Sequence, residues 1–135
     1  MYDAALELKD AGAVTSSGYG TVDEEAAVVN VGEGMVKGRL IIEVSEVEIA
    51  DNDELYVIHL MGGDDESFTN TVSLGSIELG ANEVLEGNVD SQTGRYEVPF
   101  TNEQNGTIYP YLRVRHVISG TVATGINYKA YMSRR

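Results

Sequence analysis

The stretch Thr107–Ser119 reads TIYPYLRVRHVIS and alternates apolar residues with polar or aromatic ones. One parity carries the apolar side chains Ile108, Leu112, Val114 and Ile118. A period of two is typical of a strand with one face buried in a core. The stretch therefore predicts a β-strand, the longest that the sequence offers.

Shorter strand-like segments lie on both sides of it, separated by turns rich in glycine, asparagine and aspartate. They cover residues 26–31, 39–49, 55–61, 68–79, 95–100 and 126–132. Apolar parity switches near Ser45, which predicts a bulge or a bend, and Asn105-Gly106 is typical of a hairpin turn. No apolar pattern keeps helical spacing over three turns. The sequence thus predicts an all-β protein, an antiparallel β-sandwich of the jelly-roll type.

A chain of 135 residues is long enough for one domain with its own core. We expect residues 26–135 to form that β-sandwich domain. Residues 1–25 are expected to be an N-terminal arm and linker, because Ala11–Gly20 is rich in glycine, serine and threonine. The polar segment between Gly80 and Gly94 is expected to be a long crossover loop.

Composition excludes several classes of protein. There is no cysteine, so disulfides, cysteine-ligated zinc and thiol chemistry are absent. The formal net charge of −13 argues against binding to nucleic acid or to an anionic membrane surface. No run approaches the ~20 apolar residues of a membrane-spanning helix. Charges at four of the first ten residues argue against a cleavable signal, so synthesis in the cytoplasm is expected.

The sequence offers little for catalysis. Its two histidines, His59 and His116, each lie in an apolar strand pattern, which is more typical of packed or hydrogen-bonded residues than of catalytic bases. No metalloprotease, nucleophile-elbow or P-loop spacing is present. Asp51-Asn52-Asp53 and Asp64-Asp65-Glu66 lack the glycine and glutamate positions of a calcium-binding EF-hand loop and read as turns. We expect no enzyme activity, no cofactor and no metal.

Charge is distributed unevenly along the chain. Residues 1–90 hold 20 acids and 3 bases, whereas residues 91–135 hold 2 acids and 6 bases. The second parity of the long strand carries Tyr109, Tyr111, Arg113 and Arg115, residue types enriched at protein interfaces. These four residues, together with Leu6 and Leu8 of the arm, are the predicted contacts with a partner. The alternatives are a solvated surface and pairing with acids on a neighbouring strand.

The segment Leu55–Met61 (LYVIHLM) is apolar on both parities. One face of a strand in an antiparallel sandwich normally meets water. Either a loop or another subunit is therefore expected to cover the outer face. We expect a homo-oligomer, a dimer in preference to a trimer.

Several short segments resemble, in order, the jelly-roll capsid cement proteins of tailed phages, as known from Bordetella phage. They are Tyr2–Leu8, Val28–Gly32, Tyr111–Val114, Ile118–Thr121 and Gly125-Ile126. That family usually has an aspartate before the glycine of its second segment, whereas this chain has Asn30 two positions before Gly32.

This resemblance implies a structural role on a virion. Cement proteins sit on the outer surface of a shell of HK97-like major capsid proteins and bridge capsomers against the pressure of packaged DNA. Residues 1–25 would then be an arm that adds an edge strand to a neighbour, or else a frayed terminus. The alternative function, from another class, is a lectin-like or receptor-binding sandwich on a virion or a cell surface.

Overall fold

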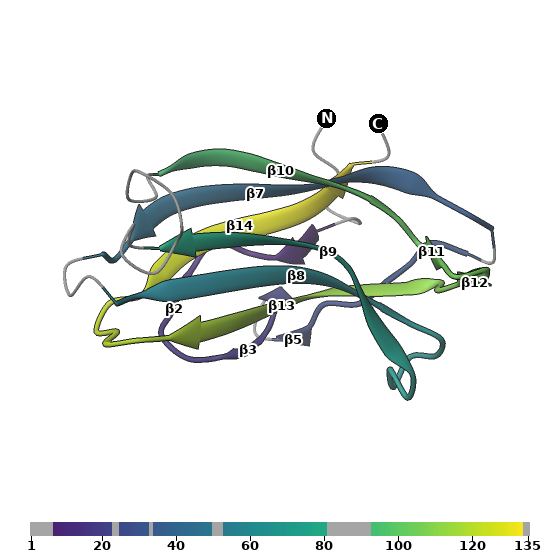
Figure 1. The fold of residues 1–135 in the computed structure, drawn as a ribbon, viewed down its shortest axis with the longest axis horizontal. Coiled ribbons are helices and arrows are strands. Elements are labelled where there is room, and N and C mark those ends of the chain that lie inside the picture. Colours follow the sequence, from purple (N-terminus) through teal and green to yellow (C-terminus); the bar gives the residue numbers. More distant parts are fainter. Residues whose placement is uncertain (1–6, 23–24, 33, 50–52, 81–92, 134–135) are drawn as a thin grey trace.

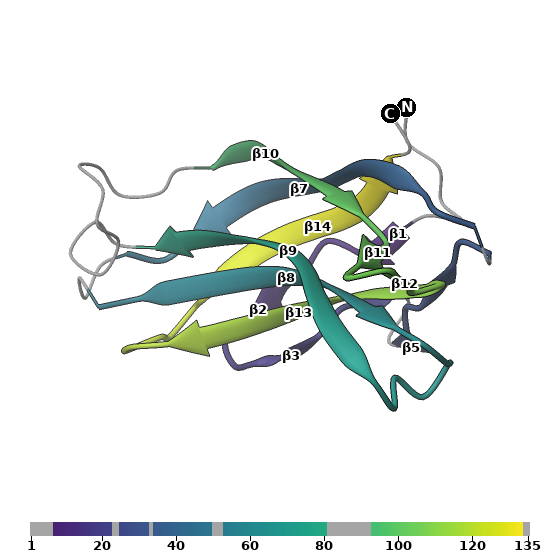
Figure 2. The ribbon, with the colours of Figure 1, turned by 45° about the vertical axis from the view of Figure 1, so that its right-hand side comes forward.

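The computed structural model describes residues 7–22, 25–32, 34–49, 53–80 and 93–133. Throughout these residues the chain forms strands, turns and loops, without a helix. No membrane-crossing helix, which would have to be long and apolar, is found in this part of the chain. Two antiparallel sheets pack face to face, which confirms the predicted all-β sandwich (Figures 1 and 2).

The first layer is here called the β7 sheet. It has the order β1-β14-β7-β10, and β2 also pairs with β14. Its strands are β1 (Glu7–Lys9), β2 (Ala13–Val14), β7 (Lys37–Val47), β10 (Gly94–Thr101) and β14 (Ile126–Ser133).

The second layer is here called the β13 sheet. It has the order β3-β13-β8-β9, and β6 also pairs with β13. Its strands are β3 (Gly18–Tyr19), β6 (Val29–Asn30), β8 (Leu55–Gly63), β9 (Thr71–Gly80) and β13 (Tyr111–Ser119).

Two short hairpins complete the fold. One joins β4 (Thr21–Val22) to β5 (Glu25–Ala26), and the other joins β11 (Glu103–Gln104) to β12 (Thr107–Ile108). The second hairpin turns at Asn105 and Gly106, whose φ angles are +53° and +84°. Positive φ at both central residues is what a tight two-residue hairpin needs. The hairpin expected from Asn105-Gly106 is therefore confirmed.

The core lies between the two sheets and follows the predicted period of two. From the β7 sheet it receives Leu40, Ile42, Val44, Val98, Phe100, Ile126, Tyr128, Ala130 and Met132, and from the β13 sheet Tyr56, Ile58, Leu60, Leu79, Leu112 and Val114. Successive side chains of a strand point to opposite faces, so alternation in sequence becomes one apolar layer in space. The burial of these side chains is the main favourable term in folding.

A bulge interrupts the pairing of β7 with β14. Tyr128 is opposite Val44 and Asn127 is opposite Glu46, so Ser45 is the extra residue on β7. A bulge changes which face the following residues occupy. The parity switch predicted at Ser45 is thus confirmed, and Val47 still packs against the core beyond it.

The expected arm is wrong for residues 7–22. β1 and β2 pair with β14, β3 pairs with β13, and the Leu8 side chain is completely buried in the core. In this glycine- and serine-rich segment, Gly20 lies in a tight passage next to β1. At Gly20, a Cβ atom would collide with the carbonyl of Leu8. This segment runs from one sheet to the other and belongs to the domain, so the predicted boundary at residue 25 is not present.

The expected single strand over Thr107–Ser119 is divided in two. β12 ends at Ile108 and β13 begins at Tyr111. Pro110 has no backbone N–H and cannot donate to a sheet ladder. Its carbonyl instead accepts a hydrogen bond from Val31 N at 2.8 Å, and Tyr109 N donates to Asn102 O at 2.8 Å.

Two expectations remain predictions. The crossover loop between Gly80 and Gly94 lies mostly outside the described residues, although β9 and β10, on either side of it, belong to different sheets. The jelly-roll connectivity is the other; the strand pairs β7 with β14 and β8 with β13 belong to the sandwich.

Replacing Leu8 by alanine tests whether this segment belongs to the core. We expect Leu8→Ala to lower the free energy of unfolding by about 2–5 kcal/mol, because it leaves a cavity in a buried site. Urea denaturation measures this loss. The control is Met35→Ala, since Met35 is 55% exposed and its truncation should change stability by about 0.5 kcal/mol or less. Equal stability of the two variants would mean that residues 7–22 do not pack as described.

Candidate interaction surface

The outer face of the β13 sheet gathers aromatic and cationic side chains from several strands. We call it the β13 face and define it by Tyr19, His59, Met61, Tyr111, Arg113 and Arg115. Arg113 is opposite Met61 of β8, and Arg115 is opposite both His59 of β8 and Tyr19 of β3. Residues directly opposite on paired strands share one face of the sheet. Pairing of distant segments therefore brings these side chains together.

Arg113 is held by two aromatic rings. Its guanidinium carbon lies 3.8 Å from the centroid of the Tyr19 ring and 4.0 Å from that of Phe68. Phe68 belongs to the turn between β8 and β9, has a φ angle of +53° and is buried. Its ring fills the space that a side chain on Gly63 would need. Cation–π contacts of this kind fix the orientation of a long side chain.

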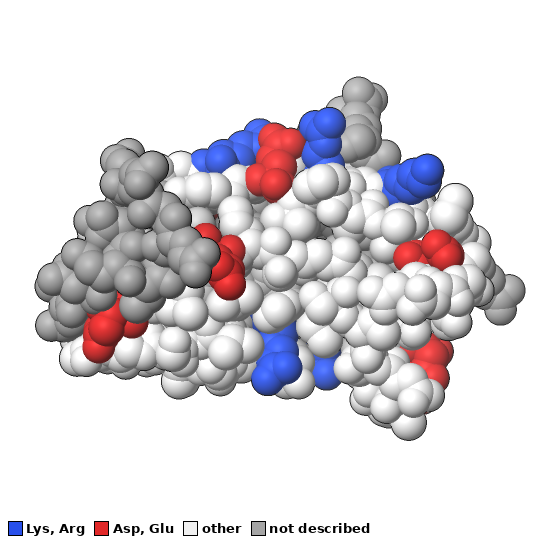
Figure 3. Space-filling model, viewed as in Figure 1, with Lys and Arg blue, Asp and Glu red and all other residues white. Residues whose placement is uncertain are grey.

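The arginines on the outer faces of the two sheets differ in their ion pairs. On the β7 sheet, Arg39 and Arg95 both form ion pairs with Glu97, and Lys129 pairs with Glu7. On the β13 sheet, neither Arg113 nor Arg115 has an ion-pair partner among the described residues. Figure 3 shows the corresponding separation, with cationic side chains along two opposite rims of the molecule. The cross-strand pairing with acids considered from the sequence is thus not found for these arginines in the described part of the chain.

A hollow of about 280 Å³ adjoins this face. It is lined by Val28, Asn30, Glu66 and Tyr111. Val28 is 37% exposed and the nearby Tyr19 is 47% exposed, which is high for large apolar side chains. An exposed apolar rim next to unpaired cations is typical of a protein contact surface.

The six residues that were predicted to contact a partner lie in different parts of the protein. Tyr111, Arg113 and Arg115 lie on the β13 face, as predicted. Tyr109 precedes the break at Pro110. Its Cβ lies close to Gly62, a residue on the same, core-facing parity of β8 as Leu60. Leu8 is a core residue and is not available as a contact. Leu6 lies outside the described residues.

The two aromatic residues that hold Arg113 were not anticipated. Tyr19 lies in the expected linker and Phe68 in the expected strand over 68–79, so neither was assigned to the face. Only the pairing of β3 with β13 and the turn after Gly63 place their rings against Arg113. No periodicity in the sequence connects residues so far apart.

The outer side of β8 is half-buried rather than exposed. Leu55, Val57, His59 and Met61 all have intermediate exposure. His59 Nδ1 shares a hydrogen bond with Ser73 Oγ at 3.1 Å. Burial lowers the pKa of the His59 imidazole, and the Arg115 charge lowers it further. His59 is therefore largely neutral near pH 7 and adds little charge to the face.

His116 and Lys9 form a separate, buried cluster with Tyr128. Lys9 Nζ donates to the carbonyls of Asp10, Gly12 and Tyr128 at 2.9, 2.9 and 2.7 Å, and lies 4.3 Å from the centroid of the Tyr128 ring. Tyr128 Oη shares a hydrogen bond of 2.7 Å with His116 Nδ1. The expectation that His116 is a packed, hydrogen-bonded residue is confirmed. The side chains of Lys9, His116 and Tyr128 thus link β1, β13 and β14.

Burial shifts the ionisation of this cluster. It lowers the pKa of Lys9 to about 8, against the opposing effect of the Asp10 carboxylate. Burial and the Lys9 charge lower the pKa of His116 to about 4. Burial raises the pKa of the Tyr128 hydroxyl. At neutral pH the cluster therefore holds one cation, on Lys9, beside a neutral imidazole and a neutral phenol.

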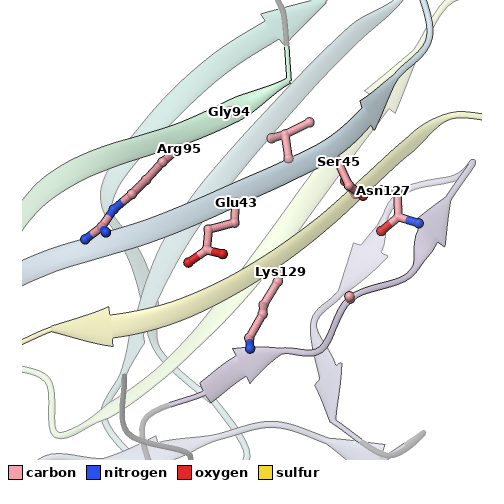
Figure 4. Close-up of a pocket in the computed structure, with 8 residues that line it drawn as sticks. Glu43, Ser45, Gly94, Arg95, Asn127 and Lys129 are labelled. Carbon is pink, nitrogen blue, oxygen red and sulfur yellow. The ribbon is translucent and has the colours of Figure 1, made fainter. Parts of the chain in front are cut away.

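A second hollow, of about 510 Å³, lies on the β7 sheet beside the Ser45 bulge (Figure 4). Its charged groups already have partners: Glu43 accepts a hydrogen bond from Tyr131 Oη at 2.8 Å, Arg95 pairs with Glu97, and Lys129 with Glu7. Only Asn127 Oδ1 is buried there without a hydrogen-bond partner among the described residues. The hollow thus offers less unsatisfied charge than the β13 face.

The carboxylates of the loops are used to shape them. Glu48 Oε1 accepts from the backbone N–H groups of Ala123, Thr124 and Gly125, and Asp65 accepts from those of Ser67 and Thr69. These hydrogen bonds lower the pKa of both carboxyl groups. No cluster of potential metal ligands occurs within the described part of the chain.

No protein-family model matches the chain, and no curated protein is significantly similar to it.

The His116 cluster makes stability depend on pH. The pKa of His116 is about 4 in the folded protein, against its ordinary value of 6.5, so the unfolded chain binds more protons between these values. The free energy of unfolding should therefore fall by roughly 2 kcal/mol on acidification from pH 6.5 to pH 4. Urea denaturation at a series of pH values, compared with His116→Gln, isolates this contribution. The difference in free energy of unfolding between wild type and His116→Gln should not change with pH above pH 7. If that difference also stayed constant from pH 7 down to pH 4, the buried neutral histidine would be contradicted.

Proposed function

We propose that this protein is a capsid cement protein, which binds the outer surface of a shell of HK97-like major capsid proteins and bridges capsomers to stabilise the DNA-filled head. The resemblance of its sequence to the cement proteins of tailed phages supplies the identity of the partner. The proposed role is structural, with no catalytic step, cofactor or metal. Its place is the outer surface of the virion, after synthesis in the host cytoplasm.

The observation that carries the binding role is the β13 face. It holds two arginines without ion-pair partners in the described part of the chain, beside exposed Tyr19 and Val28. Arginine and tyrosine dominate the energetics of protein interfaces, because they combine large apolar area with hydrogen bonding. A rigid sheet presents them in fixed positions, so little conformational entropy is lost on binding.

Shell symmetry would amplify modest contacts. A dimer that touches two capsomers at once makes its second contact at a high effective concentration, so avidity can exceed the affinity of each contact by 10²–10⁴-fold. Leu55 and Val57, which are half-buried on the outer side of β8 and do not belong to the β13 face, are compatible with such a dimer. Homo-oligomerisation, with a dimer preferred to a trimer, is part of this proposal.

Cosedimentation tests the proposal directly. Purified protein is mixed with expanded, undecorated shells of the candidate major capsid protein, and the shells are pelleted. Saturation at a stoichiometry that matches the shell symmetry is the expected result. Absence of binding by well-folded protein, or absence of the chain from purified virions, would overturn the proposal.

A double charge reversal tests which face binds. We expect Arg113→Glu with Arg115→Glu to weaken binding to shells by about tenfold or more, since both changes fall on the β13 face. The matched control is Arg39→Glu with Arg95→Glu, which changes net charge equally on the opposite sheet and should leave binding within about twofold. Both variants are first compared with the wild-type protein by thermal melting. Equal effects of the two pairs would show that net charge, and not the β13 face, governs binding.

A lectin-like module is the second candidate. The hollow beside Ser45 contains an unpartnered buried Asn127 Oδ1 and the Glu43 carboxylate, groups that hydrogen-bond to hydroxyls. A glycan array distinguishes the two, because a cement protein should bind no glycan. Glycan binding that Asn127→Ala abolishes would favour the lectin-like function.

A further inference from the structure

We propose that Arg113 is a preformed receptor for a carboxylate, and that the β13 face accepts an acidic, extended segment of its protein partner. This inference deepens the proposed function, on which it rests, by stating the chemistry of the partner. Three features of the described residues carry it: the fixed orientation of Arg113, its unsatisfied donors and the adjoining hollow, where Val28 and Tyr111 lie beside the polar Asn30 and Glu66.

The orientation of Arg113 is fixed before binding. Its guanidinium contacts the rings of Tyr19 and Phe68 from two separate parts of the fold, at 3.8 and 4.0 Å. Phe68 is itself buried, so that ring cannot swing away. A free arginine loses much rotamer freedom on binding an anion, and the aromatic contacts have already removed that freedom.

The hydrogen-bond donors of Arg113 are unsatisfied. Its Nε is buried and has no hydrogen-bond partner among the described residues, and no described carboxylate forms an ion pair with it. Guanidinium donors match the two oxygens of a carboxylate in a bidentate pair. Arg115 lies two residues along the same face and is likewise without an ion pair in this part of the chain. A carboxylate of a partner at this face would reduce the repulsion between the two cations.

The hollow beside Tyr111 adds an apolar requirement. Tyr111 and Arg113 are two residues apart on one face of β13, which separates them by roughly 6.6–6.8 Å along the strand. Residues i and i+2 of an extended partner segment have the same separation. A segment with an apolar residue two positions from an acid can therefore place one side chain at Val28 and Tyr111 and the other at Arg113.

Charge favours a discrete carboxylate over a polyanion. The chain carries a net charge of −13. This charge repels a nucleic acid along the whole length of that polyanion. A single acidic side chain is attracted by the local positive field of Arg113 and Arg115, which acts at short range. A second copy of this chain, which is also acidic, is the competing occupant, and the tests below separate it from a different partner.

The first test uses peptides and needs no shell. The probe is a blocked pentapeptide, acetyl-Ser-Val-Ser-Glu-Ser-amide, compared with the same peptide carrying glutamine in place of glutamate. Binding is followed by the ¹⁵N–¹H signal of the Arg113 side-chain Nε, with the Arg95 signal as an internal control. A saturable shift at Arg113 with the glutamate peptide alone is the expected result. No shift, or equal shifts with both peptides, would overturn the carboxylate receptor.

The second test uses shells and conservative variants. Arg113→Lys keeps the positive charge but loses the planar bidentate geometry, and Tyr19→Leu removes one ring from an exposed position. We expect Arg113→Lys to weaken binding about tenfold and Tyr19→Leu by a smaller factor, with Arg95→Lys unchanged. Thermal melting confirms that each variant folds.

The outcomes distinguish this inference from the proposed function. If wild-type protein binds shells and Arg113→Lys binds equally well, the cement role stands and the receptor is wrong. If shells are not bound but the glutamate peptide shifts Arg113, the receptor stands and the cement role is wrong. A dimer in sedimentation equilibrium that Arg113→Lys dissociates would identify a second copy as the occupant and overturn the proposal of a different partner.

Discussion

The docking of residues 7–22 across both sheets is the constraint on which the candidate surface depends. Leu8 fills the core, and the Lys9 ammonium, with its three carbonyl acceptors, fixes the turn that follows β1. That segment then continues to β3, where Tyr19 lies against Arg113. A surface contact thus depends on a buried cation at the other end of the same segment.

The contacts between neighbouring segments also explain why the two sheets differ in the charges on their outer faces. On the β7 sheet, Glu97 of β10 lies within ion-pair distance of Arg39 on β7 and of Arg95 on its own strand, so both cations have a partner within the chain. On the β13 sheet, the neighbours of Arg113 and Arg115 are Met61, His59 and aromatic rings. Stacking orients a guanidinium without neutralising it. An acidic protein therefore keeps two cations without ion-pair partners among the described residues on one face, and aromatic rings orient one of them, Arg113.

Much of the architecture follows from local patterns. The period of two in β13 predicted which of its side chains face the core, the parity change at Ser45 predicted the bulge, and Asn105-Gly106 predicted a hairpin. The failures have a common cause. Ala11–Gly20 has the composition of a linker, yet backbone pairing and close approaches such as that of Gly20 to Leu8 use the same small residues. Composition cannot distinguish a free chain from one that passes tightly over a sheet.

The sequence by itself determined the all-β class, the inward parity of the main strands and the choice of Arg113 and Arg115 as surface residues. These are properties of neighbouring residues, because alternation and turn chemistry act over a few positions. Only the tertiary structure decided that Leu8 is core, that Tyr109 leaves the face at Pro110, and that Tyr19 and Phe68 hold Arg113. Each of those outcomes depends on strand pairing between distant segments. The free energy that selects such pairings comes from burial of the whole core, which no local pattern contains.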